Sequence, residues 1–161
     1  MPYPTTKYLL LTEQKNWIVE VLAQQGLTLT DITPLAEHAD TRRYLRLHTT
    51  ENSIICLQTT GPHDLSGFIH ATLCLTEQHV PTPIILAQNI PLGLVLLSDL
   101  GDNTLLKILR QSPQKKLFWY EKALFLLQDI QKADYPTTKP DYDTILARKN
   151  AQLCPEWFCE K

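Results

Sequence analysis

The stretch GLVLLSDLGD, from Gly93 to Asp102, marks the point where one kind of sequence pattern gives way to another. Residues 94–97 form an uninterrupted apolar run, which is typical of a strand buried on both faces. Residues 98–101 follow at once with polar and turn-forming side chains. Upstream the chain carries mostly strand patterns and downstream only helical ones. We therefore take this stretch as the junction between a sheet and a helical region.

Upstream of the junction, short apolar runs between polar breaks predict β-strands, and two longer periodic stretches predict helices. The helices are expected at residues 13–25, with Thr12 as N-cap and Gly26 as the end, and at residues 64–79. The first three strands form an antiparallel meander, and the last two form a hairpin whose strands are both buried on two faces. The strands are expected at residues 27–35, 44–47, 54–57, 84–87 and 94–97.

Downstream of Gly101 the apolar residues recur at helical spacing, in segments separated by loops that contain proline. Helices are predicted at residues 105–109, 117–130 and 145–158. The order of elements therefore indicates an α+β fold, in which a five-stranded antiparallel sheet with helices is followed by helices alone.

The 161-residue chain has 15 basic and 17 acidic side chains and a formal net charge of −2. Neither half has the excess of positive charge that would attract a phosphate backbone, which disfavours nucleic acid as a partner. The most apolar stretch, residues 83–97, is interrupted by polar residues, Pro91 and Gly93, so we expect no membrane-spanning segment. These features predict a globular, cytoplasmic protein.

The four cysteines do not have the spacing of a zinc site. Cys56 and Cys74 lie in apolar runs, as free buried thiols often do, and Cys154 and Cys159 are five residues apart. We therefore expect reduced, structural cysteines and no metal site.

Four motifs, in register over residues 17–158, carry a resemblance to a known family. The motifs are ADTRRYLRL at 39–47, VPTPIILAQ at 80–88, GLVLLSDLGD at 93–102, and Tyr142-Asp143 with LCPEWF at 153–158. On these motifs the chain resembles the aminoglycoside-phosphotransferase and choline-kinase-like family, and is most similar to the bacterial kinases that phosphorylate N-acetylmuramate and N-acetylglucosamine at the anomeric carbon. The resemblance implies a kinase-like N-lobe at residues 1–97, a hinge at 98–103 and the helical start of a C-lobe at 104–161.

The resemblance assigns the adenine of ATP to the hinge, where main-chain groups would pair with the base. Asp99 and Leu100 would supply those groups, and Leu97 would line the pocket. Main-chain groups left unpaired at the end of a sheet suit a flat heterocycle. The alternative interpretation is a turn that caps the next helix, since Asp and Gly favour turns in any case.

A loop over the phosphates is implied between the first two strands, at residues 36–43, where Thr41, Arg42 and Arg43 are the candidate ligands. Related kinases usually carry Gly-Asp-Ala-Ser before the arginines, whereas this chain has Glu-His-Ala-Asp at 37–40. The two arginines are equally consistent with solvated positions at a strand end. The third strand lacks the lysine that grips phosphates in many kinases, and Glu77 is interpreted as a surface charge.

Two apparent motifs are interpreted as structural. His38 and Asp40 imitate the HxD of a kinase catalytic loop, but they lie between the first two strands. Asp141 and Asp143 imitate a metal-binding pair, but their place before the last predicted helix favours an N-terminal cap. No catalytic residue and no metal ligand is therefore assigned.

Phosphoryl transfer needs a base and carboxylates that hold Mg²⁺, and the resemblance implies that both lie beyond Lys161. We therefore expect the N-terminal part of an ATP-dependent sugar phosphotransferase, inactive alone, that receives its amino sugar only with a C-lobe. The sugar would come from peptidoglycan recycling, or the substrate would be an aminoglycoside. The alternatives are a non-catalytic module that binds itself or a complementing C-lobe chain through its last helices, and an unrelated α+β binding domain.

Overall fold

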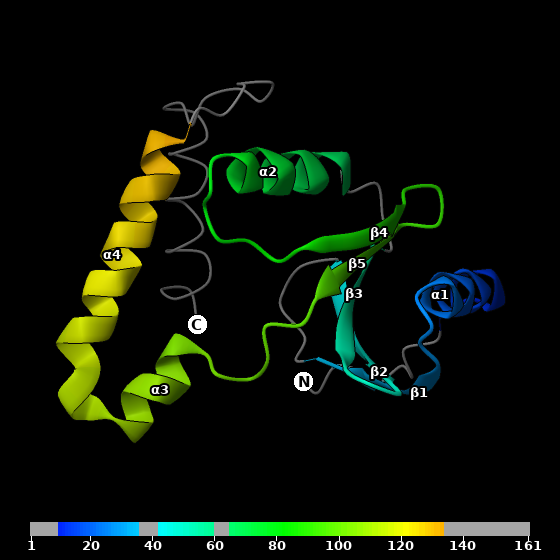
Figure 1. Cartoon of the computed structure of the whole chain (residues 1–161), viewed down its shortest axis with the longest axis horizontal. Helices are drawn as coiled ribbons and strands as arrows, with labels where there is room; N and C mark the ends of the chain where they lie inside the picture. Colours follow the sequence, from blue (N-terminus) through cyan, green and yellow to red (C-terminus); the bar gives the residue numbers. More distant parts are fainter. Residues whose placement is uncertain (1–9, 36–41, 60–64, 134–161) are drawn as a thin grey trace, which may run out of the picture.

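The centre of the molecule is a five-stranded antiparallel sheet with the strand order β1-β2-β3-β5-β4 (Figure 1). The computed structural model describes residues 10–35, 42–59 and 65–133. All five predicted strands are present, and the predicted α+β class is confirmed. The strands are β1 (Leu29–Pro34), β2 (Arg42–Thr49), β3 (Ser53–Thr59), β4 (Ile85–Asn89) and β5 (Leu94–Ser98).

One helix covers each face of the sheet. Alternate residues of a strand point to opposite faces, so apolar side chains on both faces need a covering element. Helix α1 (Thr12–Gln24) packs Ile18 and Leu22 onto one face, against Leu45, Leu47, Cys56 and Leu96, among others. Helix α2 (Leu65–Glu77) packs Leu65 and Ile69 onto the other, against Ile55, Leu57, Val95 and Leu97. The register of β2, β3 and β5 therefore determines which side chains lie under α2.

Helix α1 ends as its sequence predicts and begins one residue earlier than expected. Gly26 has a φ of 73°, and its N–H and that of Leu27 bond to the carbonyls of Ala23 and Leu22, which is the glycine-terminated end that Gly26 indicated. The N-cap is Leu11 rather than Thr12. The main-chain N–H of Leu11 donates to Gln14 Oε1 at 3.0 Å, so the glutamine side chain satisfies the N-cap residue, and Thr12 does not perform the capping that was expected of it.

The last hairpin differs from the prediction in one strand. Residues 94–97 of β5 are all buried, as predicted. In β4, by contrast, every second residue is exposed, so the expectation of burial on both faces was wrong. The physical reason is position, since the strand residues buried beneath α1 and α2 come from β2, β3 and β5, and the edge strand β4 adds only the partly buried Ile85 and Ala87.

Beyond the sheet, α3 (Leu105–Gln111), a 3₁₀ turn η1 (Pro113–Lys115) and α4 (Lys116–Lys132) extend away from the strands (Figure 1). These are the first two downstream helices predicted, while the helix predicted at 145–158 lies outside the described residues. Thr104 caps α3, because its Oγ1 accepts from the N–H of Lys107 at 3.3 Å. Across the described ranges, no helix is both long and apolar enough to cross a membrane.

The two described cysteines are free, as predicted. Cys56 is fully buried in the core beneath α1, and burial raises the pKa of its thiol to about 12. Cys74 is only half-buried, which corrects the expectation that both thiols are buried. Cys154 and Cys159 lie outside the described residues.

Candidate functional site

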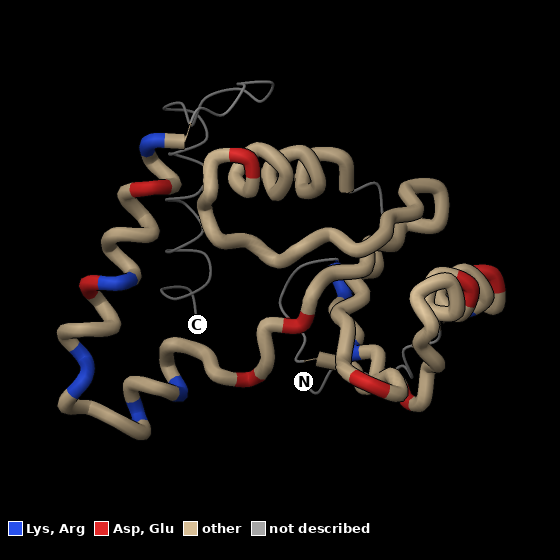
Figure 2. Tube along the Cα trace, in the orientation of Figure 1, with Lys and Arg blue, Asp and Glu red and all other residues tan. Residues whose placement is uncertain are grey.

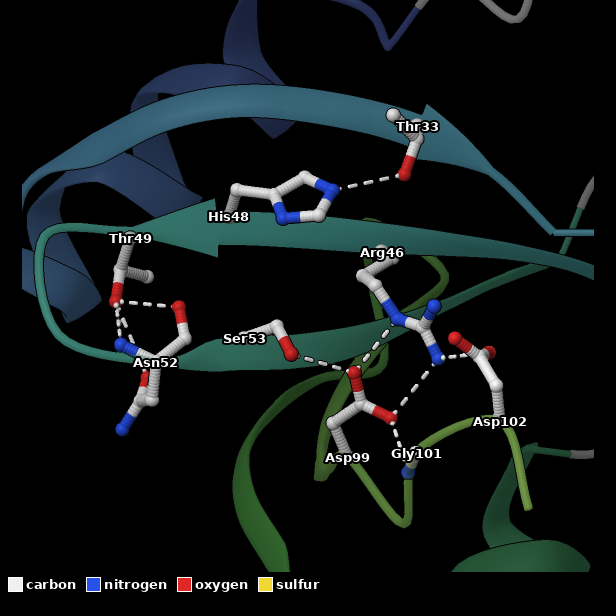
Figure 3. A network of polar contacts seen from close by, with 9 residues as sticks. All are labelled: Thr33, Arg46, His48, Thr49, Asn52, Ser53, Asp99, Gly101 and Asp102. Carbon is white, nitrogen blue, oxygen red and sulfur yellow. Dashed lines mark hydrogen bonds and ion pairs between the residues drawn. The ribbon is translucent and has the colours of Figure 1, made fainter.

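A network of ionic hydrogen bonds fixes the linker that leaves β5 (Figure 3). The Asp99 carboxylate accepts from Ser53 Oγ at 2.6 Å and from Arg46 Nε at 2.6 Å. It also accepts from Arg46 Nη2 at 3.2 Å and from the main-chain N–H of Gly101 at 2.8 Å. Arg46 Nη2 reaches Asp102 Oδ1 at 2.9 Å. One carboxylate thus ties the linker to both β2 and β3.

The network keeps Asp99 ionised although its side chain is only 8% exposed. Burial by itself raises the pKa of Asp99, but the hydrogen bonds from Ser53, Arg46 and Gly101 and the charge of Arg46 outweigh it, so the pKa lies below its usual value. The hydrogen bonds to Asp102 and Asp99 raise the pKa of Arg46 in turn. Arg46 and Asp99 therefore form a hydrogen-bonded ion pair, and neither is an isolated charge.

The linker between β5 and α3 is anchored on both sides of Asp99 and Leu100, whose main-chain groups have no hydrogen-bonding partner among the described residues. Ser98 is tied to the edge strand, since its N–H donates to the Ile84 carbonyl at 2.9 Å and its Oγ accepts from the Ile84 N–H at 2.9 Å. Gly101, with a φ of 76°, is held by Asp99. Between them, the main-chain groups of Asp99 and Leu100 make no hydrogen bond with the described parts of the chain. Leu100 is 73% exposed.

Asp99 and Leu100, the predicted main-chain contacts, thus have no main-chain hydrogen bond within the described ranges. Leu97 differs, because its side chain is 3% exposed and packs between the sheet and α2. The alternative interpretation was that residues 98–102 form a turn that caps the next helix. In the structure Thr104 caps that helix instead.

The strand register separates the two candidate arginines. Arg46, Ile55 and Leu97 are directly opposite one another across β2, β3 and β5, so they share the α2 face of the sheet. Arg42 shares that face, and its guanidinium lies 6.0 Å from the ring centroid of Phe68 in α2. Arg43 points to the opposite face, because it pairs with Gln58, which bonds to Gln14 of α1. Thr41 lies outside the described residues.

Within the described ranges, no group of three or more histidine, cysteine or acidic side chains could hold a metal ion. His38, Asp40, Asp141 and Asp143 lie outside those ranges. The third strand, β3, carries no lysine, and Glu77 is exposed as expected.

The sequence reasoning missed Arg46, Ser53 and Asp102. The signal in the sequence was Arg46, a charged residue in the middle of a strand with an apolar residue on each side of it. Arg46 stands between Leu45 and Leu47, and both of those leucines are buried. A cation in that position needs an anionic partner, and Asp99 and Asp102, which follow β5, supply it.

A sheet with a helix on each face, followed by helices, has the α+β architecture of a kinase-like N-lobe and the helices after it. Comparison with curated proteins agrees. The chain is 34% identical over 129 residues to an N-acetylmuramate/N-acetylglucosamine kinase of Pseudomonas aeruginosa, which covers 80% of the chain and 38% of that protein. Proteins of the same name from Neisseria meningitidis and Pseudomonas putida are 30% and 29% identical, over 91% and 92% of the chain.

The predicted resemblance to this group of sugar kinases is thus confirmed. The chain spans about two-fifths of the length of these curated relatives, with 44% and 43% covered in the second and third. No protein-family model matches the chain.

Proposed function

We propose that this chain is the nucleotide-binding part of an ATP-dependent amino-sugar kinase. Residues 1–97 form the N-lobe, 98–103 the hinge and 104–161 the start of a helical C-lobe. The observation that carries the proposal is the unpaired main chain of Asp99 and Leu100 at the end of a buried strand, in a chain similar to sugar kinases over most of its length.

In this arrangement the base of ATP lies against the exposed main chain of Asp99 and Leu100. A main-chain N–H and a main-chain carbonyl offer one donor and one acceptor, which suits the edge of an adenine. Leu97 supports this site from β5 with a side chain that is buried against α2. The proposal needs no side-chain contact to the base, which agrees with the full engagement of the Asp99 carboxylate inside the protein.

The phosphates extend along the α2 face of the sheet toward the start of β2. Arg42 lies four residues before Arg46 on the same face, which corresponds to about 13 Å along a strand. A guanidinium suits phosphate oxygens because it donates in a planar fork. Arg42 is therefore the favoured phosphate ligand of the two arginines, with Thr41 beside it in the loop, and Arg43 faces α1 instead.

The names of the relatives support a kinase of N-acetylmuramate or N-acetylglucosamine as the whole enzyme. The γ-phosphate of ATP would pass to the anomeric hydroxyl of an N-acetylated amino sugar, with an aminoglycoside as the second substrate class. Mg²⁺ would neutralise the phosphates, but the described residues contain no cluster of carboxylates for it. We therefore propose that residues 1–161 bind ATP and do not transfer its phosphate.

The test is to titrate the 161-residue chain with adenosine and with ATP and to measure binding by calorimetry. Both should bind, and no phosphorylated amino sugar should form. Arg42→Gln should weaken ATP about tenfold, because a charge-assisted hydrogen bond contributes about 1.5–3 kcal/mol, and should leave adenosine unchanged. Arg43→Gln is the matched control, one residue away on the opposite face, and should alter neither. A wild-type chain that binds neither ligand would refute the proposal.

A second candidate function is a non-catalytic module that binds a partner chain or a second copy. It is favoured by one observation, the exposed apolar side chains of α4, including Leu117, Leu124 and Phe125. Sedimentation at several concentrations, with and without ATP, separates the two functions, because only the module should assemble without nucleotide.

A further inference from the structure

We propose that Asp99, Arg46 and Ser53 are positioning residues that make the linker selective for adenine over purines with an oxygen at position 6. This inference rests on the proposed nucleotide site and assigns its selectivity. The three side chains contact no base. They act by holding the main chain of Asp99 and Leu100 in one geometry (Figure 3).

The first step is that the Asp99 carboxylate is saturated. An ionised carboxylate offers about four acceptor positions, and here it accepts four hydrogen bonds. Such bonds to an ionised group are about twice as strong as neutral ones. Asp99 therefore cannot serve as a ligand without breaking its own network, and its function is confined to the protein.

The second step concerns where the four donors come from. Ser53 is the first residue of β3, Arg46 lies within β2, and Gly101 belongs to the linker itself. The carboxylate thus connects the linker to two strands that are not its direct continuation. A linker held only by β5 would be free to rotate its peptide planes, whereas this one is fixed on both sides of Leu100.

The third step is chemical. The edge of adenine presents an amino donor at C6 next to an acceptor at N1, and hypoxanthine presents an oxygen acceptor next to an N–H donor. A main chain with a fixed order of carbonyl and N–H fits only one of these. A main chain whose peptide planes can turn accommodates both. Because Asp99 already occupies the Gly101 N–H, that group is not available as an alternative donor.

The test is the ratio of the dissociation constants for adenosine and inosine, measured by calorimetry on the full 161-residue chain. The wild type should prefer adenosine by about tenfold or more, as expected when the wrong base covers main-chain groups and leaves them unpaired. Asp99→Asn keeps the shape but loses the charge, and should reduce this preference about fivefold or more. Arg46→Lys keeps a cation and should retain more selectivity than Arg46→Gln.

Thr49→Val is the matched control. Thr49 is in β2 like Arg46, and its hydroxyl donates to the Asn52 carbonyl at 2.9 Å in the turn to β3, at the end of the strand away from Arg42 (Figure 3). This variant removes a hydrogen bond and lowers stability without touching the linker, so its selectivity should equal that of the wild type. Ser53→Ala is the milder second variant, which removes one of the four bonds and keeps the test open if Asp99→Asn does not fold.

The outcomes separate this inference from the proposed function. A wild type that does not bind adenosine overturns both. A wild type that binds adenosine without preferring it to inosine overturns the inference alone. So does full selectivity in Asp99→Asn, or in Ser53→Ala if that is the variant that folds. Equal losses of selectivity in Thr49→Val and Asp99→Asn would also overturn it, because the effect would then report stability only.

Discussion

The sheet region, residues 10–98, and the helical region, residues 105–133, both carry regular apolar patterns but differ sharply in how far their apolar side chains are buried. Residues 94–97 of β5 are all buried, and α1 and α2 each bury residues against the sheet. In α3, η1 and α4 none is buried. Charged residues occur in both regions, although β3, β4 and β5 carry none (Figure 2).

This difference shows that apolar periodicity predicts a helix but not its partner. Residues 117–130 carry a helical pattern as regular as that of α1, yet Leu117, Leu124 and Phe125 are each more than half exposed. Helices in proteins gain most of their stability from packing an apolar face, rather than from the helix itself. We therefore expect the free energy of unfolding to reside in the sheet region, and the predictions below test that division.

The largest effect is expected from Leu96→Ala in the centre of the sheet. Leu96 is 0% exposed and packs in the cluster beneath α1. Removing its side chain should leave a cavity that costs about 2–5 kcal/mol. Urea denaturation followed by the fluorescence of Trp17, which packs against the same cluster, measures this loss when Trp119 and Trp157 are replaced by Phe. A loss below about 1 kcal/mol would contradict a stability centred on the sheet.

The second effect is an acid-dependent loss of stability at the boundary between the two regions. The pKa of Asp99 is lowered in the folded protein, so its contribution is complete above the ordinary carboxyl pKa of about 4 and is lost as the pH falls through the folded value. The gap in unfolding free energy between wild type and Asp99→Asn should therefore be widest at pH 7 and narrow below pH 4. Thr49→Val, which removes no titratable group, should show a gap independent of pH. A constant gap for Asp99→Asn would refute the assignment.

The third effect sharpens the division by stabilising only the sheet region. His79 ends α2 with a φ of 60°, which is a left-handed conformation that glycine adopts without strain. The N–H of His79 bonds to the Thr76 carbonyl at 3.0 Å, so the turn itself should survive the substitution. His79→Gly should therefore raise the free energy of unfolding by about 0.5–1 kcal/mol. Trp17 fluorescence should report the gain, and a loss of stability would show that the histidine side chain makes a contact that matters.

The sequence predicted more of the fold than of the candidate site. The five strands and the two helices that accompany the sheet followed from runs such as residues 54–57 and 94–97, because burial on a sheet imposes its own periodicity, but the position of β5 beside β3 did not follow from them. The exposed face of β4 did not, since whether a strand lies at an edge depends on the order of strands in space.

The site was predicted only at the level of its backbone. The junction at residues 98–101 was visible as a change of pattern, and Asp99 and Leu100 were identified there. The Arg46–Asp99 pair was not, because its members are 53 residues apart and are brought together by the pairing of β2 with β3 and of β3 with β5. The choice between Arg42 and Arg43 likewise needed the register, which assigns successive residues to opposite faces.

The smallest effect is expected from Leu124→Ala in α4, the counterpart of Leu96→Ala. Leu124 is 63% exposed, so the substitution removes few contacts and should change the free energy of unfolding by less than about 0.5 kcal/mol. Leu96→Ala and Leu124→Ala delete the same atoms from a leucine. The ratio of their losses in unfolding free energy therefore compares the packing of the two regions directly. A cost above about 1.5 kcal/mol would mean that Leu124 is covered in solution. Sedimentation of wild type and Leu124→Lys would then identify a second copy as the cover, because only self-association depends on protein concentration and should be abolished by the buried charge.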